Sequence, residues 1–484
     1  MKVIRVLVLT FAVLSSPSNA QETLTPARWM THLTEDLLPF WMHPDALDDG
    51  SGMYPSMRCN DGSKFRRDAP CREIASVEWM TPFKNYVIAI SRQAYAYGVA
   101  FHMTGDPVYL AHARRGVDVL MAAARDRDAG GHFEGFDQET GEWGPKDRSI
   151  TLQKQAYALL GPAFYYYLTR DPAVLEMIRE TRQMILRDHF DPATGFYTRF
   201  RKGVIRPRES TGRLVSYLDQ LNTYYQQIAP LLAGEERADW IGSMAGIAAV
   251  IRDRFHVQKY NAIITNLDRT KRKPSRFPQS DFGHTIKSFW FLQMVGALDG
   301  DRALIEFAET AGKDIIRRSF LGQTGSWSHG YDKRGKRRDD KNFWVYIEHD
   351  QFLASLALKE PKWRETLARA YAYWLERFVD TDTGGVFNAL DLGSRRPRDD
   401  LPKHWAWKSG FHEFEHALVA YITSAGIAEE PLDLYFAFDE PPVEETIYPY
   451  FYGGTIDDIA IRAMQDARTV TRVRFSEIGF PRVN

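Results

Sequence analysis

The stretch FPQSDFGHTIKSFWFLQMVGAL, residues 277–298, begins as a polar loop and continues with apolar residues at helical spacing. His284 stands where the loop ends, and Lys287 follows three positions later on the same face of the expected helix. Histidine suits acid–base catalysis because its ordinary pKa lies close to neutral pH. The stretch therefore predicts a buried helix with a candidate catalytic group at its entrance, beside a positive charge.

The same kind of apolar spacing recurs from about residue 27 to about residue 428, where strand-like alternation is scarce. Several of the expected helices are followed by loops with acidic or polar residues, one or two glycines and an aromatic or aliphatic residue. These loops are DRDAGGHFEGFD (126–137), HFDPATGFYTRF (189–200), FLGQTGSWSHGYD (320–332) and VDTDTGGVFNALD (379–391). Each is expected to form a short hairpin. Helix, hairpin and helix in repetition predict helix pairs in a closed ring, a mainly α (α/α) toroid whose inner helix ends form a concave site.

The end of the chain has a different pattern. The segments LDLYFAFDEPP (432–442), TIYPYFYGGTI (446–456) and TVTRVRFSEIG (469–479) alternate and favour β-forming residues. We therefore expect a helical domain over residues 21–430, followed by a small β-rich C-terminal extension over residues 431–484.

The start of the chain predicts export. Lys2 and Arg5 precede a short apolar run, and Ser18 and Ala20 occupy small-residue cleavage positions. This pattern is typical of a secretory signal peptide, residues 1–20, cut after Ala20, so we expect a periplasmic or secreted protein. No later run approaches the roughly 20 apolar residues of a membrane-spanning helix. The formal net charge of −1 gives no basic excess that would favour nucleic acid.

Cys59 and Cys71 are the two cysteines of the chain. In an oxidising compartment they are expected to form a disulfide, and the alternative is a pair of free thiols. Two cysteines alone do not make a zinc site, so we predict no metal site from them.

Six segments, in order along the chain, resemble motifs of the N-acylglucosamine 2-epimerase family, which includes cellobiose 2-epimerases and mannose isomerases. They are SRQAYAYGVAFHMTGD (91–106), DRDAGGHF (126–133), LQKQAYAL (152–159), GHTIKSFWFLQMVGAL (283–298), KNFWVYIEHDQFLASLAL (341–358) and WKSGFHEFEHAL (407–418). The resemblance covers residues from about 80 to about 428. It implies an (α/α)6 barrel that moves a proton at C2 of a reducing sugar with two histidines and without a metal or redox cofactor.

The resemblance also implies site residues. His284 and His412 stand in the histidine motifs and are the expected catalytic residues. The expected substrate-binding residues are Arg92, Asn222, Tyr224, Trp344, Glu348 and Trp407. The alternative for the charged members of this set is an ion pair between helices, and for the tryptophans it is burial in the core.

Two charges depart from the family pattern. Lys287 stands where the family usually has glutamate, and Glu415, three residues after His412, stands where it often has arginine. We interpret Lys287 and Glu415 as a charge-swapped pair that tunes the histidines. An ammonium near His284 is expected to lower its pKa, and Glu415 is expected to keep His412 protonated. Alternatively, Lys287 binds an acidic substrate.

The expected function is 2-epimerisation of a reducing mono- or oligosaccharide through an enediolate, or aldose–ketose isomerisation between C1 and C2. A glycan hydrolase or lyase on the same toroid is an alternative, because similar rings support several chemistries. A hydrolase would need two carboxylates facing the cleft, for which Asp281, Glu348, Asp350 and Glu415 are available. A glycan-binding protein without catalysis is the third possibility.

Overall fold

The computed structural model describes residues 22–48, 50–77, 79–145, 150–202, 212–267, 280–332, 334–392, 395–440, 443–463 and 469–482. The expected signal peptide, residues 1–20, lies outside these ranges, so its cleavage after Ala20 stays a prediction. In the part of the chain that the structure describes, no helix combines the length and the apolar character needed to cross a membrane.

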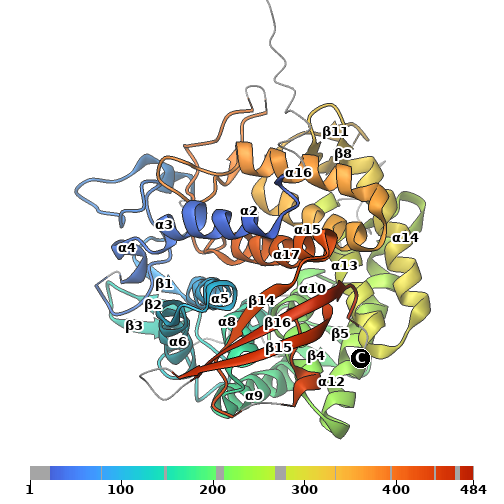
Figure 1. Cartoon of the computed structure of the whole chain (residues 1–484). Helices are drawn as coiled ribbons and strands as arrows, with labels where there is room; N and C mark the ends of the chain where they lie inside the picture. The colour runs from blue at the N-terminus through green and yellow to red at the C-terminus, as the bar shows by residue number, and fades with distance from the viewer. Residues whose placement is uncertain are drawn as a thin grey trace, which may run out of the picture.

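Within the described ranges, six inner helical segments alternate with six outer ones (Figure 1). The inner segments are α5 (Val87–Thr104), α7 (Leu152–Ala158) with α8 (Leu160–Thr169), α10 (Val215–Gln220) with the π-helical η3 (Leu221–Tyr225) and α11 (Gln226–Ile228), α13 (Phe282–Asp299), α15 (Phe343–Lys359) and α17 (Phe411–Ala428). The outer segments are α6 (Pro107–Met121), α9 (Pro172–His189), α12 (Gly234–Val250), α14 (Arg302–Ser319), α16 (Arg364–Arg377) and the N-terminal run α2 (Pro26–Thr31), η1 (His32–Leu37) and α3 (Leu38–Trp41).

The ring closes because α17 packs against α5 on one side and against α15 on the other. The N-terminal run supplies the outer partner of α17, and Trp41 Nε1 donates a hydrogen bond to Glu413 Oε1 at 3.0 Å. Inner helices are buried almost all round, whereas outer helices bury one stripe, as expected for two concentric layers. The predicted mainly α toroid is therefore present.

Antiparallel pairing occurs in all four loops that were expected to form hairpins. Residues 189–200 form β4 (Phe190–Asp191) and β5 (Phe196–Tyr197), and residues 320–332 form β8 (Phe320–Leu321) and β9 (Ser326–Trp327). In the loop 126–137, His132 pairs with Arg125, which directly precedes the loop, and the loop 379–391 contains the bridge Val379–Val386. Each hairpin follows an outer helix and precedes an inner one, so the N-terminal ends of the inner helices meet at one face of the ring.

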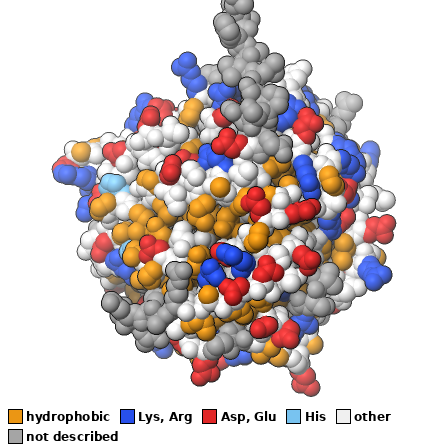
Figure 2. Space-filling view, in the orientation of Figure 1, with side chains coloured by type: hydrophobic (Ala, Val, Ile, Leu, Met, Phe, Trp, Pro, Cys, Tyr) orange, Lys and Arg blue, Asp and Glu red, His pale blue; other side chains and the backbone are white. Residues whose placement is uncertain are grey.

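The C-terminal sheet covers the opposite face. It contains β14 (Leu432–Phe436), β16 (Thr469–Gly479) and β15 (Gly453–Ala463), in that order and antiparallel. The ring of Tyr435 lies over Gly105, the left-handed residue that ends α5, where a Cβ would come within 2.5 Å of the ring. Figure 2 shows acidic and basic side chains side by side over this region, where Arg474 pairs with Asp433 at 2.8 Å. The outer face of the sheet is therefore solvated.

The expected strand over residues 446–456 is wrong in its first half. Strand β15 begins at Gly453, and residues 447–452 are irregular and largely buried. Ile447 and Tyr448 are both buried, as are Tyr450 and Phe451, so burial does not alternate along this segment as it would in a strand with one exposed face. This segment, 447–452, closes the axis of the ring from the side of the sheet.

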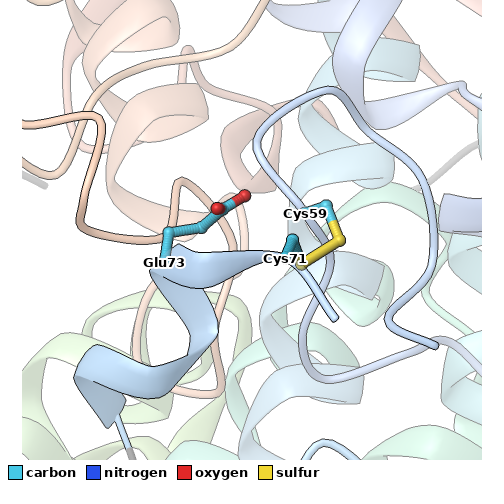
Figure 3. A group of neighbouring side chains, drawn as sticks. All are labelled: Cys59, Cys71 and Glu73. Carbon is cyan, nitrogen blue, oxygen red and sulfur yellow. A yellow bond between two sulfur atoms is a disulfide. The ribbon is translucent and has the colours of Figure 1, made fainter. Parts of the chain in front are cut away.

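The predicted disulfide joins Cys59 and Cys71, with their Cα atoms 5.8 Å apart (Figure 3). These sulfurs and a carboxylate oxygen of Glu73 form the one group of potential metal ligands found within the described ranges. The sulfurs are used in the disulfide, and Glu73 Oε1 accepts a hydrogen bond from the backbone N–H of Asn60 at 2.6 Å.

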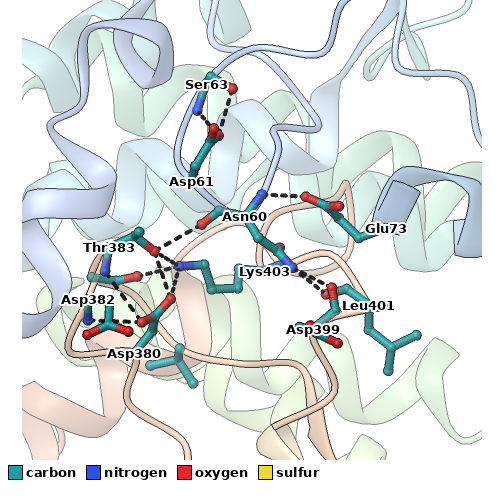
Figure 4. Close-up of polar contacts among 12 residues, drawn as sticks. Asn60, Asp61, Ser63, Glu73, Asp380, Asp382, Thr383, Asp399, Leu401 and Lys403 are labelled. Carbon is teal, nitrogen blue, oxygen red and sulfur yellow. Dashed lines mark hydrogen bonds and ion pairs between the residues drawn. The ribbon is translucent and has the colours of Figure 1, made fainter. Parts of the chain in front are cut away.

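Asn60, next to Cys59, holds the loop that leads to α17 (Figure 4). Its side chain donates to the carbonyls of Asp399 at 3.0 Å and Leu401 at 3.1 Å. It also accepts from the backbone N–H of Lys403 at 2.7 Å, and the Lys403 ammonium lies 2.6 Å from Asp380 Oδ2. The disulfide loop therefore anchors the chain just before Trp407 and His412.

Replacing both cysteines by serine is expected to lower the free energy of unfolding by about 3 kcal/mol, because the cross-link closes a short loop in the unfolded chain. Urea unfolding of the oxidised protein and of the Cys59→Ser/Cys71→Ser variant measures the difference. An unchanged midpoint and slope would contradict the role given to the disulfide.

Candidate active site

The candidate site lies at the face where the inner helices begin. His284 is the third residue of α13, and His412 is the second residue of α17. Lys287 lies one turn into α13, and Glu348 lies in the second turn of α15. Arg92, in the second turn of α5, faces the same space. The structure thus brings together five of the residues expected from the sequence.

A buried ion pair joins α13 to α15. Lys287 Nζ lies 2.7 Å from Glu348 Oε1, and the two side chains are 5% and 1% exposed. The same oxygen lies 3.5 Å from His412 Nε2. Burial alone would lower the pKa of Lys287, but the charge of Glu348 outweighs it and raises this pKa above its ordinary value. Lys287 therefore stays charged and directs its ammonium to Glu348 on α15.

Asp281 controls His284. As the N-cap of α13, its Oδ1 accepts from the backbone N–H of His284 at 2.6 Å, and its Oδ2 lies 2.8 Å from His284 Nδ1. Burial lowers the pKa of His284, but the charge and hydrogen bond of Asp281, helped by Asp219, outweigh this and raise it. Burial would raise the pKa of Asp281, yet His284 holds it at about 2. Nδ1 of His284 is thus committed to Asp281, and Nε2 is left for other chemistry.

The expected division of charge between the histidines is wrong. Lys287 was expected to make His284 neutral, but Asp281, which is in direct contact, raises the pKa of His284 instead. Glu415 was expected to keep His412 protonated, but burial, together with Lys287 and Arg92, lowers the pKa of His412 to about 3. The raised pKa of His284 makes it the better candidate for the acid, and the lowered pKa of His412 makes it the better candidate for the base.

Lys287 and Glu415, which were expected to form a charge-swapped pair, are also not in direct contact. Lys287 binds Glu348, while Glu415 Oε1 accepts a hydrogen bond from Tyr450 Oη at 2.7 Å. Glu415 acts on Lys287 only through its field, as one of several negative neighbours. The structure therefore replaces the expected pair by a Lys287–Glu348–His412 cluster with Glu415 behind it.

Arg92 is held by aromatic rings and a carbonyl. Its guanidinium lies 4.3 Å from the ring centre of Tyr157 and 5.3 Å from that of Trp407, and Nη1 donates to the carbonyl of Trp407. Burial lowers the pKa of Arg92, with Tyr157 and Asp219 acting in the opposite sense. Among the described residues its Nε has no hydrogen-bond partner. Among the residues that the structure describes, Arg92 makes none of the interhelical ion pairs that were the expected alternative.

Asp219 and Tyr157 join the site although the sequence analysis did not select them. Asp219 Oδ2 accepts from Gln153 Nε2 at 2.8 Å, and Tyr157 Oη lies 3.4 Å from Oδ1. Burial raises the pKa of Asp219, against the fields of Lys287 and His284. Tyr157 lies within the motif LQKQAYAL. Its contact with Arg92 joins two helices that are separated along the sequence, so no local pattern reveals it. Asp219 had no local signal.

Asn222 lies on η3, one turn after Asp219, and is 1% exposed. Within the described part of the chain neither atom of its amide group has a hydrogen-bond partner. Buried amides are normally paired, so such a group indicates a missing partner. π-Helical turns of this kind are frequent at functional sites.

Two aromatic predictions have different outcomes. Trp344 packs edge-on against His284 with ring centres 4.8 Å apart, and its ring lies over Gly283, where a Cβ would come within 2.5 Å. Tyr224 instead stacks on Tyr225 at 4.5 Å and meets Trp240 of the outer helix α12 at 6.0 Å. The structure does not bring Tyr224 into the site, because its ring fills the space between the two helical layers.

The four carboxylates considered for glycan hydrolysis are each engaged. Asp281 binds His284, Glu348 binds Lys287, and Glu415 binds Tyr450. Asp350 accepts from Trp327 Nε1 at 2.7 Å and lies 3.2 Å from His416 Nε2, behind the site. The arrangement favours acid–base catalysis by histidines over glycan hydrolysis by a pair of carboxyl groups.

The comparisons with known proteins agree with the fold. The model of the N-acylglucosamine 2-epimerase (GlcNAc 2-epimerase) family matches residues 80–415. Cellobiose 2-epimerase of Bacteroides fragilis is 22% identical over 343 residues, which cover 65% of this chain and 78% of that protein. The structure of cellobiose 2-epimerase from Spirochaeta thermophila superposes with a TM-score of 0.68 and 17% identity, covering 86% of this chain and 100% of the other. A D-mannose isomerase structure gives a TM-score of 0.69 and 14% identity, covering 85% and 100%.

The chain belongs to the N-acylglucosamine 2-epimerase family. It is an (α/α)6 toroid and an enzyme of the isomerase class that acts on sugars.

In the Asp281→Asn variant, the loss of activity that accompanies rising pH is expected to begin at a lower pH than in the wild type. Asparagine keeps the N-cap, so the helix is retained, but the charge that raises the pKa of His284 is lost. A function of the imidazolium is present below its pKa and lost as pH rises through it. The pH profile of kcat/KM measures the shift. Near neutral pH, kcat/KM of the variant is expected to be about tenfold lower than that of the wild type.

Asp301→Asn is the matched control, because Asp301 caps α14 by accepting from the backbone N–H of Leu304 at 3.0 Å, outside the site. Identical pH profiles for Asp281→Asn and Asp301→Asn would contradict the pairing of Asp281 with His284.

Proposed function

We propose that this enzyme transfers a proton at C2 of a reducing mono- or oligosaccharide, as a 2-epimerase or an aldose–ketose isomerase, with His412 and His284 as base and acid. The observation that carries the proposal is that His284 and His412 lie at inner-helix entrances around one Lys287–Glu348 pair, each with one ring nitrogen facing a carboxylate. The opposite directions of their pKa shifts favour His284 as the acid and His412 as the base.

In the first step His412 acts as the base. Its Nε2 faces Glu348 Oε1, so the neutral ring keeps its proton there and offers the Nδ1 lone pair to the C2 proton. Glu348 then stabilises the imidazolium that forms. The electron pair left at C2 moves to the carbonyl oxygen and gives an enediolate. The ammonium of Lys287 and the guanidinium of Arg92 supply positive charge for the new negative oxygen.

In the second step His284 acts as the acid. Its Nδ1 is held by Asp281, so the proton is delivered from Nε2. Delivery to the opposite face of C2 gives the epimer, and delivery to C1, with the O2 proton passing to O1, gives the ketose. The site ends with a charged His412 and a neutral His284, which exchange protons with solvent or run the reverse reaction. The same two residues therefore serve both directions.

The test is proton NMR of the enzyme in D2O with a panel of reducing mono- and disaccharides. The wild type is expected to lose the C2 proton signal of its substrate and to give a new anomeric species. His412→Ala and His284→Ala are each expected to slow this exchange by at least about 100-fold. His112→Ala, on the outer helix α6, is the control and is expected to act like the wild type. Exchange at the wild-type rate in either site variant would refute the assignment.

Asn222 is proposed to bind a substrate hydroxyl, because its buried amide lacks a partner among the described residues. Asn222→Ala is expected to raise KM about tenfold, as the loss of a buried hydrogen bond to substrate would. Tyr224→Phe is the matched control, since Tyr224 lies two residues away and packs toward α12. Equal KM values for the two variants would contradict this role of Asn222.

A further inference from the structure

The C-terminal segment 447–452 reaches a carboxyl group behind the site. Glu415 lies one turn after His412 on α17 and is 1% exposed. Its Oε1 accepts a hydrogen bond from Tyr450 Oη at 2.7 Å, and Tyr450 Oη accepts from Tyr95 Oη at 3.0 Å. Two phenols thus connect the inner helix α5 to the carboxyl group beside the catalytic helix entrance.

The backbone holds Tyr450 in an unusual conformation. Its φ is +58°, in the left-handed region that aromatic residues rarely adopt. Tyr167 fixes the segment on both sides, because its Oη donates to the carbonyl of Tyr448 at 2.5 Å and accepts from the N–H of Tyr450 at 2.9 Å. Left-handed residues that persist in spite of their cost are concentrated at functional sites. Here the conformation directs the phenol toward Glu415.

Charged and titratable groups meet Glu415 from every side. They are Lys287 on α13, Glu348 on α15, Tyr95 on α5, Tyr450 and Tyr452 in the C-terminal segment, and His412 on its own helix. Burial, and then the charge of Glu348, raise the pKa of Glu415 to about 7, against the field of Lys287 and the hydrogen bond from Tyr450. The number of negative charges around the Lys287 ammonium therefore depends on whether Glu415 is ionised.

We propose that Tyr450 is a positioning residue of the isomerase site, whose phenol orients the Glu415 carboxyl group next to the Lys287–Glu348 pair and so sets the charge that His412 meets. The proposal rests on the proposed function of the two histidines. It makes the C-terminal extension a part of the active site, since Tyr450 comes from the segment between β14 and β15.

The proposal has a defined consequence for pH. With Glu415 protonated, one negative charge fewer surrounds the Lys287 ammonium, which stays hydrogen-bonded to Glu348, so more of its positive charge is available to the enediolate. With Glu415 ionised, the ammonium is shared between two carboxylates, and the extra negative charge opposes the enediolate. Activity is therefore expected to fall as pH rises through the pKa of Glu415.

Tyr450→Phe tests the proposal against the matched control Tyr452→Phe. Tyr452 comes from the same segment, but its Oη lies 3.0 Å from Ser355 Oγ and, among the described residues, makes no hydrogen bond to Glu415. Tyr450→Phe is expected to lower kcat about tenfold with KM within about twofold. It also removes a donor to the ionised carboxylate, so the alkaline limb of the profile moves to higher pH. Tyr452→Phe keeps the wild-type kcat and profile, and equal behaviour of the two variants would overturn the proposal.

Glu415→Gln provides a second test that does not depend on activity. The folded protein keeps a proton on Glu415 that the unfolded chain releases, so its stability falls as pH rises from about 5 to about 8. Glutamine removes this titration, and Glu415→Gln is expected to show a smaller decline. If the wild type shows no C2 exchange, the proposed function fails, while this comparison still applies. Equal declines in the wild type and in Glu415→Gln would overturn the positioning role.

Discussion

The ion pair between Lys287 and Glu348 is the interaction on which the site depends. Taking an ammonium and a carboxylate out of water is costly, and the pair is stable only because the charges meet at 2.7 Å in a nearly closed space. Removing either partner alone would leave a buried charge without compensation. The pair joins two neighbouring inner helices and lies next to the third, which carries His412. It therefore links the packing of the toroid to the charge of the site.

The toroid places these groups because its inner helices run in the same direction. Their N-terminal ends meet at one face, so residues far apart in the chain reach one space. Helix starts also provide a polar position in a buried layer, since an N-cap side chain satisfies free backbone N–H groups. Asp281 uses one oxygen for this purpose and the other for His284. One carboxylate thus ends the hairpin loop, starts the helix and sets the charge of a histidine.

Local patterns in the sequence predicted much of the fold. Helical spacing and repeated glycine-rich loops predicted the toroid and its hairpins, and the two cysteines predicted the disulfide. The motifs also selected His284 and His412, which lie at the entrances of two inner helices on either side of α15. The strand expected over residues 446–452 is absent because these residues pack inside the ring, which no local pattern reveals. Alternating β-formers predict a strand only when one face stays free.

The charge state of the site could not be predicted because it depends on contacts between helices. Spacing along α13 made Lys287 the obvious neighbour of His284, but its ammonium turns to Glu348 on another helix. Asp281 had been considered only as a possible hydrolytic carboxylate. Asp219, Tyr157 and Tyr450 reach the cluster from three further parts of the chain. Tyr224 was placed by motif position, and the π-helical turn that contains it was not foreseen.

The most direct test of this account is NMR titration of the protein with ¹⁵N-labelled histidine rings, assigned with His284→Ala and His412→Ala. The account predicts that the pKa of His284 lies above the ordinary value for histidine, while the pKa of His412 lies well below it. A charged His412 beside a neutral His284 at pH 7 would contradict the division of acid and base. Histidines that titrate together near their ordinary pKa would contradict it as well.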